Sequence, residues 1–196
     1  MVVARSGVTA DGLTRAALEL ADEVGATAVT LSALARRFGV ATPSLYAHVA
    51  GLDALRTRMA VAALREMADL ARDAIGGRAG ADALAALAGA YRDFARAHPG
   101  RYDASTFPVD PATAAGSAGP EHAAFVRAAL RGFALGAEDQ VHAVRLFGSL
   151  VAGFVALERA GAFGHSEPAP ELSWERCLAS LDALVRSWTP TPEEHP

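Results

Sequence analysis

Apolar residues recur at helical spacing along almost the whole chain, and the pattern is sharpest between residues 30 and 49. Four of them occupy positions i, i+3, i+4 and i+7 of one helical face, namely Leu31, Leu34, Ala35 and Phe38. Thr30 precedes this run as the expected N-cap. Gly39 follows it, where a chain leaving a helix needs a positive φ. The pattern predicts a short helix that ends at a tight turn.

A second helix start follows this turn. Thr42 is the expected N-cap and Pro43 the first helical residue, while Leu45 and Val49 share one buried face. Five further side chains are expected to point outward: Thr42, Ser44, Tyr46, Ala47 and His48. Hydroxyls, imidazole and a helix N-terminus all donate to phosphate oxygens. The two helices therefore predict a helix-turn-helix whose second helix enters the major groove of DNA.

An upstream helix completes a three-helix unit. Its apolar positions repeat at helical spacing, and they are Leu13, Ala17, Leu20, Ala21 and Val24. Thr9 and Asp11 mark its first turn, and Gly25 is its stop signal.

The rest of the chain also predicts helices. They are expected over 52–75, 82–98, 101–105, 121–135, 137–160 and 172–188. The stretches 103–119 and 164–170 are expected to be loops, and the tail 189–196 to be disordered. The sequence contains no convincing strand pattern, so the predicted fold class is all-α with about nine helices.

Two apolar stripes in the last two helices suggest an interface between subunits. The last helix carries a heptad-like stripe with spacings of 4, 3, 4 and 3, and the preceding helix carries a stripe with small residues that permits close approach. The predicted interface residues are Val144, Gly148, Val151, Ala152, Val155, Trp174, Leu178, Leu181, Val185 and Trp188. The alternative is that both stripes pack inside one subunit.

Composition narrows the function classes. The net charge of −4 argues against a general nucleic-acid binder, but residues 30–58 hold four arginines against the single acid Asp53. The longest apolar stretch, 146–157, is too short to span a bilayer, and no signal peptide is expected. The single Cys177 fits a reducing cytosol.

Catalytic and metal-binding patterns are weak. The six histidines are scattered without metal-ligand spacing, and Cys177 lies on an apolar stripe. There is no glycine-rich phosphate loop and no nucleophile-elbow motif. We therefore expect no enzyme activity, no metal and no cofactor.

Residues 9 to about 60 resemble the N-terminal DNA-binding domain of the TetR family of bacterial repressors. The resemblance rests on Ala17, 20–25, Thr30-Leu31, Leu34-Ala35, Gly39-Val40, Ser44-Leu45-Tyr46, His48 and Leu55. A weaker resemblance, over 147–158 with Phe163-Gly164, is to the C-terminal subgroup that carries a Trp-x-x-x-His-Gly-Phe motif. This chain keeps Gly153-Phe154 of that motif but has Ala152 at the His.

The resemblance implies roles for the outward residues of the second helix. Ser44, Tyr46 and His48 would contact phosphates, and Thr42, Pro43 and Ala47 would face base edges. The chain has Leu52 where the family often has a lysine, and Arg56 or Arg58 could replace that contact. The predicted DNA-binding set is Thr30, Arg36, Thr42, Pro43, Ser44, Tyr46, Ala47, His48 and Arg56.

The resemblance also implies a cytoplasmic homodimer that binds a near-palindromic operator and responds to a small, largely apolar effector. Residues 1–51 would read DNA, and residues 52–188 would dimerise and bind the effector. The expected effector-binding residues are Tyr91, Phe94, His98, Tyr102, Phe107, His122, Phe125 and Phe147. The alternative is a helical protein that binds a small molecule or a partner and has lost specific DNA recognition.

Overall fold

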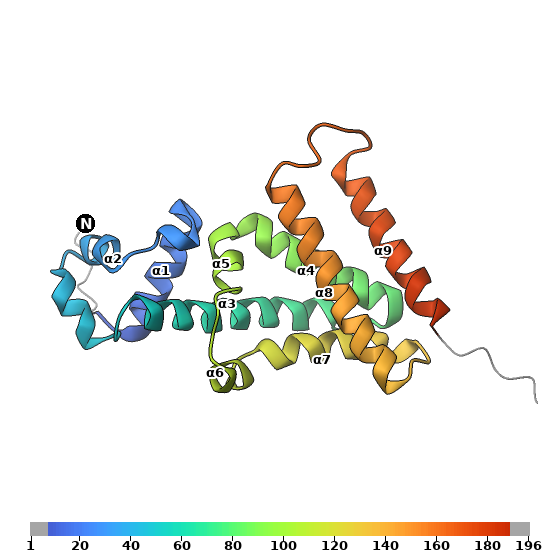
Figure 1. Cartoon of the computed structure of the whole chain (residues 1–196), viewed down its shortest axis with the longest axis horizontal. Coiled ribbons are helices and arrows are strands. Elements are labelled where there is room, and N and C mark those ends of the chain that lie inside the picture. Colours follow the sequence, from blue (N-terminus) through green and yellow to red (C-terminus); the bar gives the residue numbers. More distant parts are fainter. Residues whose placement is uncertain (1–7, 189–196) are drawn as a thin grey trace, which may run out of the picture. The chain divides into compact units, whose positions relative to one another are not determined.

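The computed structural model describes residues 8–188, and all regular structure within them is helical (Figure 1). It contains nine α-helices and three short 3₁₀ helices, which confirms the predicted all-α class for the described residues. The predicted disordered tail, 189–196, lies outside this range. In chain order the elements are α1 (Ala10–Val24), η1 (Ala26–Ala28), α2 (Leu31–Phe38), η2 (Thr42–Ala47), α3 (Leu52–Ile75), α4 (Gly80–Ala97), α5 (Pro99–Ala104), α6 (Pro111–Gly116), α7 (Gly119–Ala129), η3 (Leu130–Gly132), α8 (Ala137–Arg159) and α9 (Pro170–Ser187).

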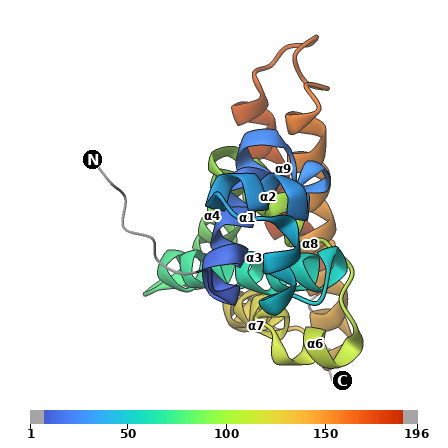
Figure 2. The ribbon, with the colours of Figure 1, turned by 90° about the vertical axis from the view of Figure 1, so that its left-hand side faces the viewer.

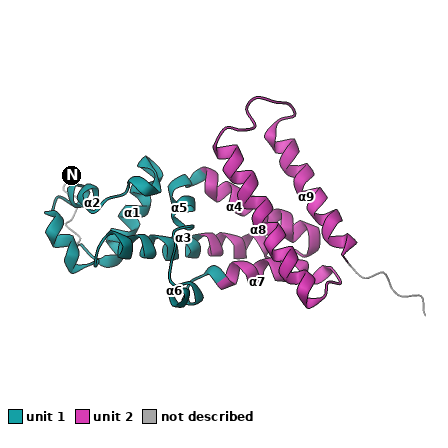
Figure 3. Ribbon diagram, in the orientation of Figure 1, with its two compact units in different colours: residues 1–66, 97–119 teal, residues 67–96, 120–196 magenta. Residues whose placement is uncertain are grey.

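The helices form two compact units (Figure 3). Unit 1 comprises residues up to 66 together with 97–119, and unit 2 comprises 67–96 together with the chain from 120 onward. The sequence placed its domain boundary between residues 51 and 52. The structure instead divides α3 between the units and places α5 and α6 with the N-terminal helices.

Unit 1 is held by one apolar core. The inward faces of α1, α2 and η2 meet the first half of α3, and α1 and α2 face the viewer in Figure 2. The largest fully buried side chains of this core are Leu13, Leu18, Val29, Leu34, Leu45, Leu55 and Met59. Leu13, Leu34 and Leu45 are positions that the helical periodicity marks as apolar. In α1 the prediction is partly wrong, because Val24 is 54% exposed and Leu18, outside the predicted stripe, is buried.

Helix α5 joins unit 1 because it can approach α1 closely. Gly100 is buried against the backbone of α1, and a Cβ atom built at this position would lie 2.0 Å from the Ala21 carbonyl. The Asp22 carboxylate accepts a hydrogen bond from the Arg101 backbone N–H at 2.9 Å. Both contacts link residues about eighty positions apart, so no local sequence pattern predicts them.

The stretch 103–119 is not a continuous loop, which corrects the sequence prediction. It contains α6, which begins at Pro111 and is capped by Asp110. One carboxylate oxygen of Asp110 accepts from the backbone N–H groups of Ala112 and Thr113, both at 3.0 Å. The Asp-Pro pair is an N-cap followed by a first-turn proline, a signal that the small and polar residues around it obscure.

Unit 2 contains a buried charge network between α4, α8 and α9. Arg92 is only 5% exposed, and its guanidinium forms a two-point ion pair with Glu158. The same guanidinium lies 5.3 Å from the ring centroid of Phe154 and 4.9 Å from that of Trp174. Arg96 also pairs with Glu158, at 2.9 Å. The network thus fastens three helices at one place.

Candidate nucleic-acid interface

Helix α2 forms as the sequence predicts. The Thr30 side chain caps it by accepting from the Ala33 N–H at 3.1 Å. Gly39 ends it in the left-handed conformation, with φ of 66°, and donates its N–H to the Ala35 carbonyl. Arg36 is exposed in the last turn. The turn that follows therefore has the geometry of a helix-turn-helix corner.

The second element of the motif is a 3₁₀ helix of six residues, Thr42–Ala47. Its N-cap is Ala41, so the prediction of Thr42 as N-cap is wrong by one residue. The Ser44 N–H donates to the Ala41 carbonyl at 2.9 Å, which is the i→i+3 pattern of this tighter helix.

The side chains of this element sort as predicted. Leu45 and Val49 are buried in the unit 1 core, and Tyr46 is 57% exposed. Pro43, Ser44 and Ala47 are exposed as well, and Thr42 and His48 are half-buried. The Tyr46 ring, the hydroxyls of Thr42 and Ser44 and the His48 imidazole therefore lie in the same short segment as Leu45, which is buried in the core.

Most of the local positive charge is neutralised within unit 1. Arg37 pairs with Glu19 at 3.2 Å and with Glu23 at 2.7 Å. Arg58 pairs with Asp11 at 2.6 Å. Within residues 8–188, the exposed Arg36 forms no ion pair. It is therefore the arginine of α2 that remains available to an external phosphate.

Arg56 lies at the start of α3, one turn beyond Leu52. Its guanidinium carbon lies 5.9 Å from the centroid of the Phe107 ring, and its Nη1 atom lies 3.5 Å from Asp53. The side chain is half-buried. The ring of Phe107 thus restricts where this cation can reach.

The predicted effector-binding residues fall into two groups. In unit 2, the Tyr91 hydroxyl and His122 Nδ1 are 2.6 Å apart, and the rings of Phe147 and Phe125 lie 6.4 Å from Tyr91 and 6.2 Å from His122. Phe94 is buried on the same helix as Tyr91. Burial raises the pKa of Tyr91 well above its usual range. We call these five residues the aromatic cluster.

The other three residues, His98, Tyr102 and Phe107, lie in unit 1. His98 Nδ1 is 3.3 Å from an Asp22 oxygen, and Phe107 packs against the unit 1 core. Tyr102 lies in α5. Regular spacing along the sequence could not reveal that the chain passes from one unit to the other between Arg96 and Ala97.

Half of the predicted interface stripe lies inside a single subunit. Val151, Val155, Trp174, Leu181 and Val185 are buried, so for these side chains the alternative of packing within one chain is correct. Gly148 and Ala152 are exposed, and Val144, Leu178 and Trp188 are not fully buried. A heptad pattern marks an apolar face but does not say what covers it.

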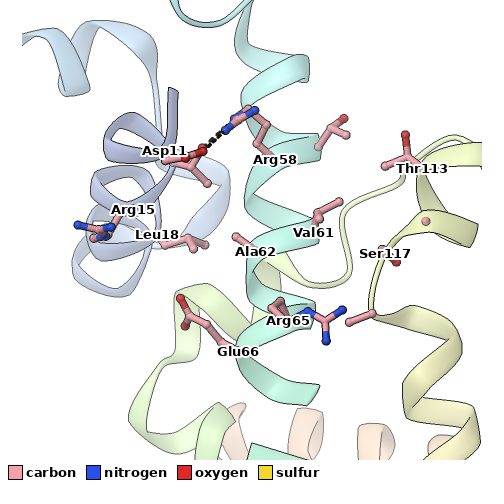
Figure 4. A pocket seen from close by; sticks show the side chains of 14 residues that line it. Asp11, Arg15, Leu18, Arg58, Val61, Ala62, Arg65, Glu66, Thr113 and Ser117 are labelled. Atoms are coloured by element: carbon pink, nitrogen blue, oxygen red, sulfur yellow. Dashed lines mark hydrogen bonds and ion pairs between the residues drawn. The ribbon is translucent and has the colours of Figure 1, made fainter. Parts of the chain in front are cut away.

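The structure also reveals a cavity that the sequence did not indicate. It has a volume of about 720 Å³ and lies entirely in unit 1 (Figure 4). Its lining is Asp11, Thr14, Arg15, Leu18, Thr57, Arg58, Val61, Ala62, Arg65, Glu66, Thr113, Gly116, Ser117 and Ala118. One wall is the segment that was expected to be a loop. Among the described residues, no group of three His, Cys, Asp or Glu side chains is placed to hold a metal ion.

The fold and the exposed second helix define a helix-turn-helix protein with an additional helical unit. Two family models match the chain, one for bacterial regulatory proteins of the tetR family over residues 13–58 and one for the tetracyclin repressor-like C-terminal domain over 84–181. The chain belongs to the TetR family of bacterial regulators.

Two curated relatives are transcriptional regulators of the helix-turn-helix type, both uncharacterized. Rv0681 of Mycobacterium tuberculosis is 37% identical over 155 residues, which cover 77% of this chain and 70% of that protein. YobS of Bacillus subtilis is 41% identical over 105 residues, 54% of this chain. The match with YobS spans only 55% of that protein's length.

Solved structures share the fold. The regulatory protein SCO4313 superposes with a TM-score of 0.72 at 29% identity, covering 88% of this chain and 94% of that one. A single-residue variant of TetR from Acinetobacter baumannii AYE, crystallised in complex with minocycline, has a TM-score of 0.67 at 21% identity, covering 94% of this chain and all of that one.

Proposed function

We propose that the protein is a homodimeric transcriptional repressor that binds a near-palindromic DNA operator and releases it on binding a small effector. The observation that carries the proposal is the outward surface of Thr42–Ala47, where Tyr46 stands exposed beside the buried anchor Leu45. Tyr46, Ser44 and His48 contact phosphates, and Thr42, Pro43 and Ala47 face base edges. Thr30, Arg36 and Arg56 add contacts at the margin.

Dimerisation uses the exposed apolar side of α8 and α9. Leu157 is 51% exposed and Leu184 is 46% exposed. A groove of about 200 Å³ between the two helices is lined by Leu146, Leu150 and Cys177, together with Leu184. Exposed apolar area of this kind marks an interaction site. A second copy that covers it completes a four-helix interface, to which the accessible Gly148 and Ala152 also contribute.

Helix α8 is also the one helix among residues 8–188 that is long and apolar enough to cross a membrane by length and composition. Only 28% of its most apolar window is buried within the chain. Coverage by a second copy accounts for this exposed surface in a cytoplasmic protein. A second copy, rather than a membrane, also agrees with Glu158 in the last turn of α8, because this residue is charged and paired with Arg92.

The effector contacts the aromatic cluster of unit 2. Tyr91 and His122 offer one hydrogen-bonded polar pair among the rings of Phe125 and Phe147, which suits a largely apolar or aromatic molecule. The effector favours a dimer in which the two recognition elements no longer match successive major grooves, about 34–36 Å apart. By linkage, operator DNA then weakens effector binding by the same factor.

The direct test is a fluorescence-anisotropy titration with DNA from upstream of the protein's own gene, at two salt concentrations. Tight binding that weakens steeply with salt supports the proposal, because counterions are released from the phosphates. Tyr46→Ala should reduce the affinity for this DNA. Arg36→Gln should reduce, by about one, the slope of the logarithm of the binding constant against the logarithm of the salt concentration. Val24→Ala is the matched control, since Val24 is 54% exposed on α1.

Binding no tighter than to random DNA, for this fragment and for a library of genomic fragments, would refute the repressor assignment. The alternative of a helical protein without specific DNA recognition would then lead. The neutralisation of Arg37 and Arg58 by carboxylates of unit 1, together with Leu52 in place of a lysine, favours that alternative.

A further inference from the structure

Arg56 is an arginine of the three-helix unit that no carboxylate holds closely. Arg37 and Arg58 pair with acids at 2.7 and 2.6 Å. Among residues 8–188, Arg56 pairs with Asp53 alone, and the Nη1–oxygen distance is 3.5 Å. The Asp53 side chain is 98% exposed, so water competes for this pair and weakens it. The charge of Arg56 therefore remains available to an external anion.

An aromatic ring, rather than a strong hydrogen bond, holds the Arg56 guanidinium. Its central carbon lies 5.9 Å from the centroid of the Phe107 ring, within the range of about 6 Å for cation–π attraction. Its Nε is shielded from solvent and has no hydrogen-bond partner within the described part of the chain. The ring contact uses no N–H donor, and most donors of a guanidinium are on the two Nη atoms. The contact thus restrains the cation and leaves Nη donors for a phosphate.

Phe107 is itself fixed, although it lies about fifty residues further along the chain than Arg56. Its backbone N–H donates to the Ala104 carbonyl at 3.1 Å, and Ala104 is fully buried in the unit 1 core. Ala104 is the last residue of α5, the helix that Gly100 brings close to α1. The Phe107 side chain packs against the same core. The ring is therefore a fixed surface against which Arg56 lies.

The guanidinium borders open space. Arg56 and Phe107 line a cavity of about 440 Å³ in unit 1, and the other lining residues are Thr27, Asp53, Thr57 and Pro108. Arg56 is the one cation of this lining and Asp53 the one acid. The two threonine hydroxyls are further donors of the kind that bind phosphate oxygens. The cavity thus leaves room for a phosphate oxygen beside the guanidinium.

We propose that Phe107 is a positioning residue for DNA binding, whose ring holds the Arg56 guanidinium in place for a backbone phosphate. This inference rests on the proposed DNA-binding function. Leu55, next to Arg56, is buried in the same core as Leu45, so this core also anchors the outward face of Thr42–Ala47. Restraining the arginine before DNA arrives lowers the entropic cost of the contact. The role differs from the effector contact that the sequence predicts for Phe107.

Fluorescence-anisotropy titrations with the DNA from upstream of the gene test this role. Phe107→Leu keeps an apolar side chain but removes the ring, and it should weaken DNA binding about three- to tenfold. Phe107→Tyr retains the ring and should bind like the wild type. Circular dichroism melts check that each variant folds, and Phe107→Met is a second ring-free variant in case Phe107→Leu does not.

A double-mutant cycle shows whether the ring acts through Arg56. Arg56→Gln alone should weaken binding and reduce, by about one, the slope of the logarithm of the binding constant against that of the salt concentration. Adding Phe107→Leu to Arg56→Gln should cause no further loss, because the group that the ring positions is gone. Phe38→Leu is the matched control, since Phe38 also packs against the unit 1 core. Any loss that it causes should be equal with and without Arg56→Gln.

The outcomes separate this inference from the proposed function. If the wild type binds this DNA specifically and Tyr46→Ala weakens binding, the DNA-binding proposal stands. Three results would then overturn the role of Phe107 alone: wild-type affinity in Phe107→Leu, an equal loss from Phe107→Leu with and without Arg56→Gln, or a Phe107→Tyr variant as weak as Phe107→Leu. A wild type without specific DNA binding would overturn both.

Discussion

Asp22 and Arg101 join the first helix of the helix-turn-helix unit to α5. One oxygen of Asp22 accepts the Arg101 backbone N–H at 2.9 Å, and the other lies 2.9 Å from the guanidinium Nε. The same guanidinium reaches Glu66 of α3 at 3.0 Å. Arg101 thus connects α5 with α1 and α3, so removing a partner of this arginine should lower the stability of the protein.

Asp22→Ala should destabilise the protein by about 1–3 kcal/mol, because it removes the acceptor of the Arg101 backbone N–H and one of the two carboxylates that pair with its half-buried guanidinium. Urea unfolding monitored by circular dichroism measures this. Glu23→Ala is the control, since Glu23 forms only a surface pair with Arg37 and should cost below about 1 kcal/mol. Equal losses in the two variants would contradict a special role for Asp22.

Two glycine-to-alanine changes should have opposite effects. In Gly100→Ala the new Cβ would lie 2.0 Å from the backbone of α1, and we expect a loss of about 3 kcal/mol or more from overpacking. Gly89→Ala adds the same methyl to the interior of α4, where nothing lies within 4 Å. It should stabilise by about 0.5–1 kcal/mol. Thermal melts decide both, and a destabilised Gly89→Ala would refute the packing argument.

The stability contributed by Glu158 should depend on pH. Its hydrogen bond with Arg92, more than any other contact, lowers its pKa below the ordinary value of 4.5. A carboxylate with a lowered pKa in the folded state stabilises above its unfolded pKa, and this contribution is lost as the pH falls toward the folded value. Urea unfolding of Glu158→Gln should therefore show a deficit of up to about 3 kcal/mol at neutral pH.

That deficit should shrink as the pH falls below about 4.5. In this range the carboxyl group becomes protonated in the unfolded chain first, so the ionised form contributes less to the free energy of unfolding of the wild type. Glu175→Gln, on the exposed side of α9, provides the comparison. A deficit that stays constant from neutral pH down to pH ~3 would mean that the side-chain shape, rather than its charge, is what matters.

Leu157→Arg should convert the proposed dimer into a monomer, because it places a charge in the apolar face of α8. Light scattering coupled to size-exclusion chromatography measures the mass. Leu70→Arg is the control, since Leu70 is similarly exposed, at 46%, on α3. A Leu157→Arg protein that keeps the wild-type mass would remove this face from the interface.

Features that depend on neighbouring residues followed from the sequence. The Thr30 cap forms as expected, with its hydroxyl accepting at 3.1 Å, and Gly39 ends α2 in the left-handed conformation. Thr9, which marks the start of α1, caps that helix by accepting at 3.0 Å. These contacts join residues three or four positions apart, so a short window contains all that decides them. The 3₁₀ geometry of Thr42–Ala47 and the helix α6 were missed because short helices carry too few periodic positions.

The predicted interface shows what the spacing of apolar residues in one helix cannot predict. The 4-3-4-3 stripe of α9 marks a true apolar face, yet Trp174, Leu181 and Val185 pack inside the subunit. Leu172 and Leu184 of the same helix remain exposed. Periodicity identifies residues that avoid water, but whether another helix of the chain or a second copy covers them depends on the packing of distant segments.

The sequence by itself determined the all-α class, the positions of most helices and the outward face of the second helix of the motif, because hydrogen bonds and periodicity within a turn or two specify them. Tertiary structure alone decided the neutralisation of Arg37 and Arg58, the division of the predicted effector residues between two units, and the cavity beside α1. Each of these depends on contacts between residues well separated along the chain, which only the packed structure brings together.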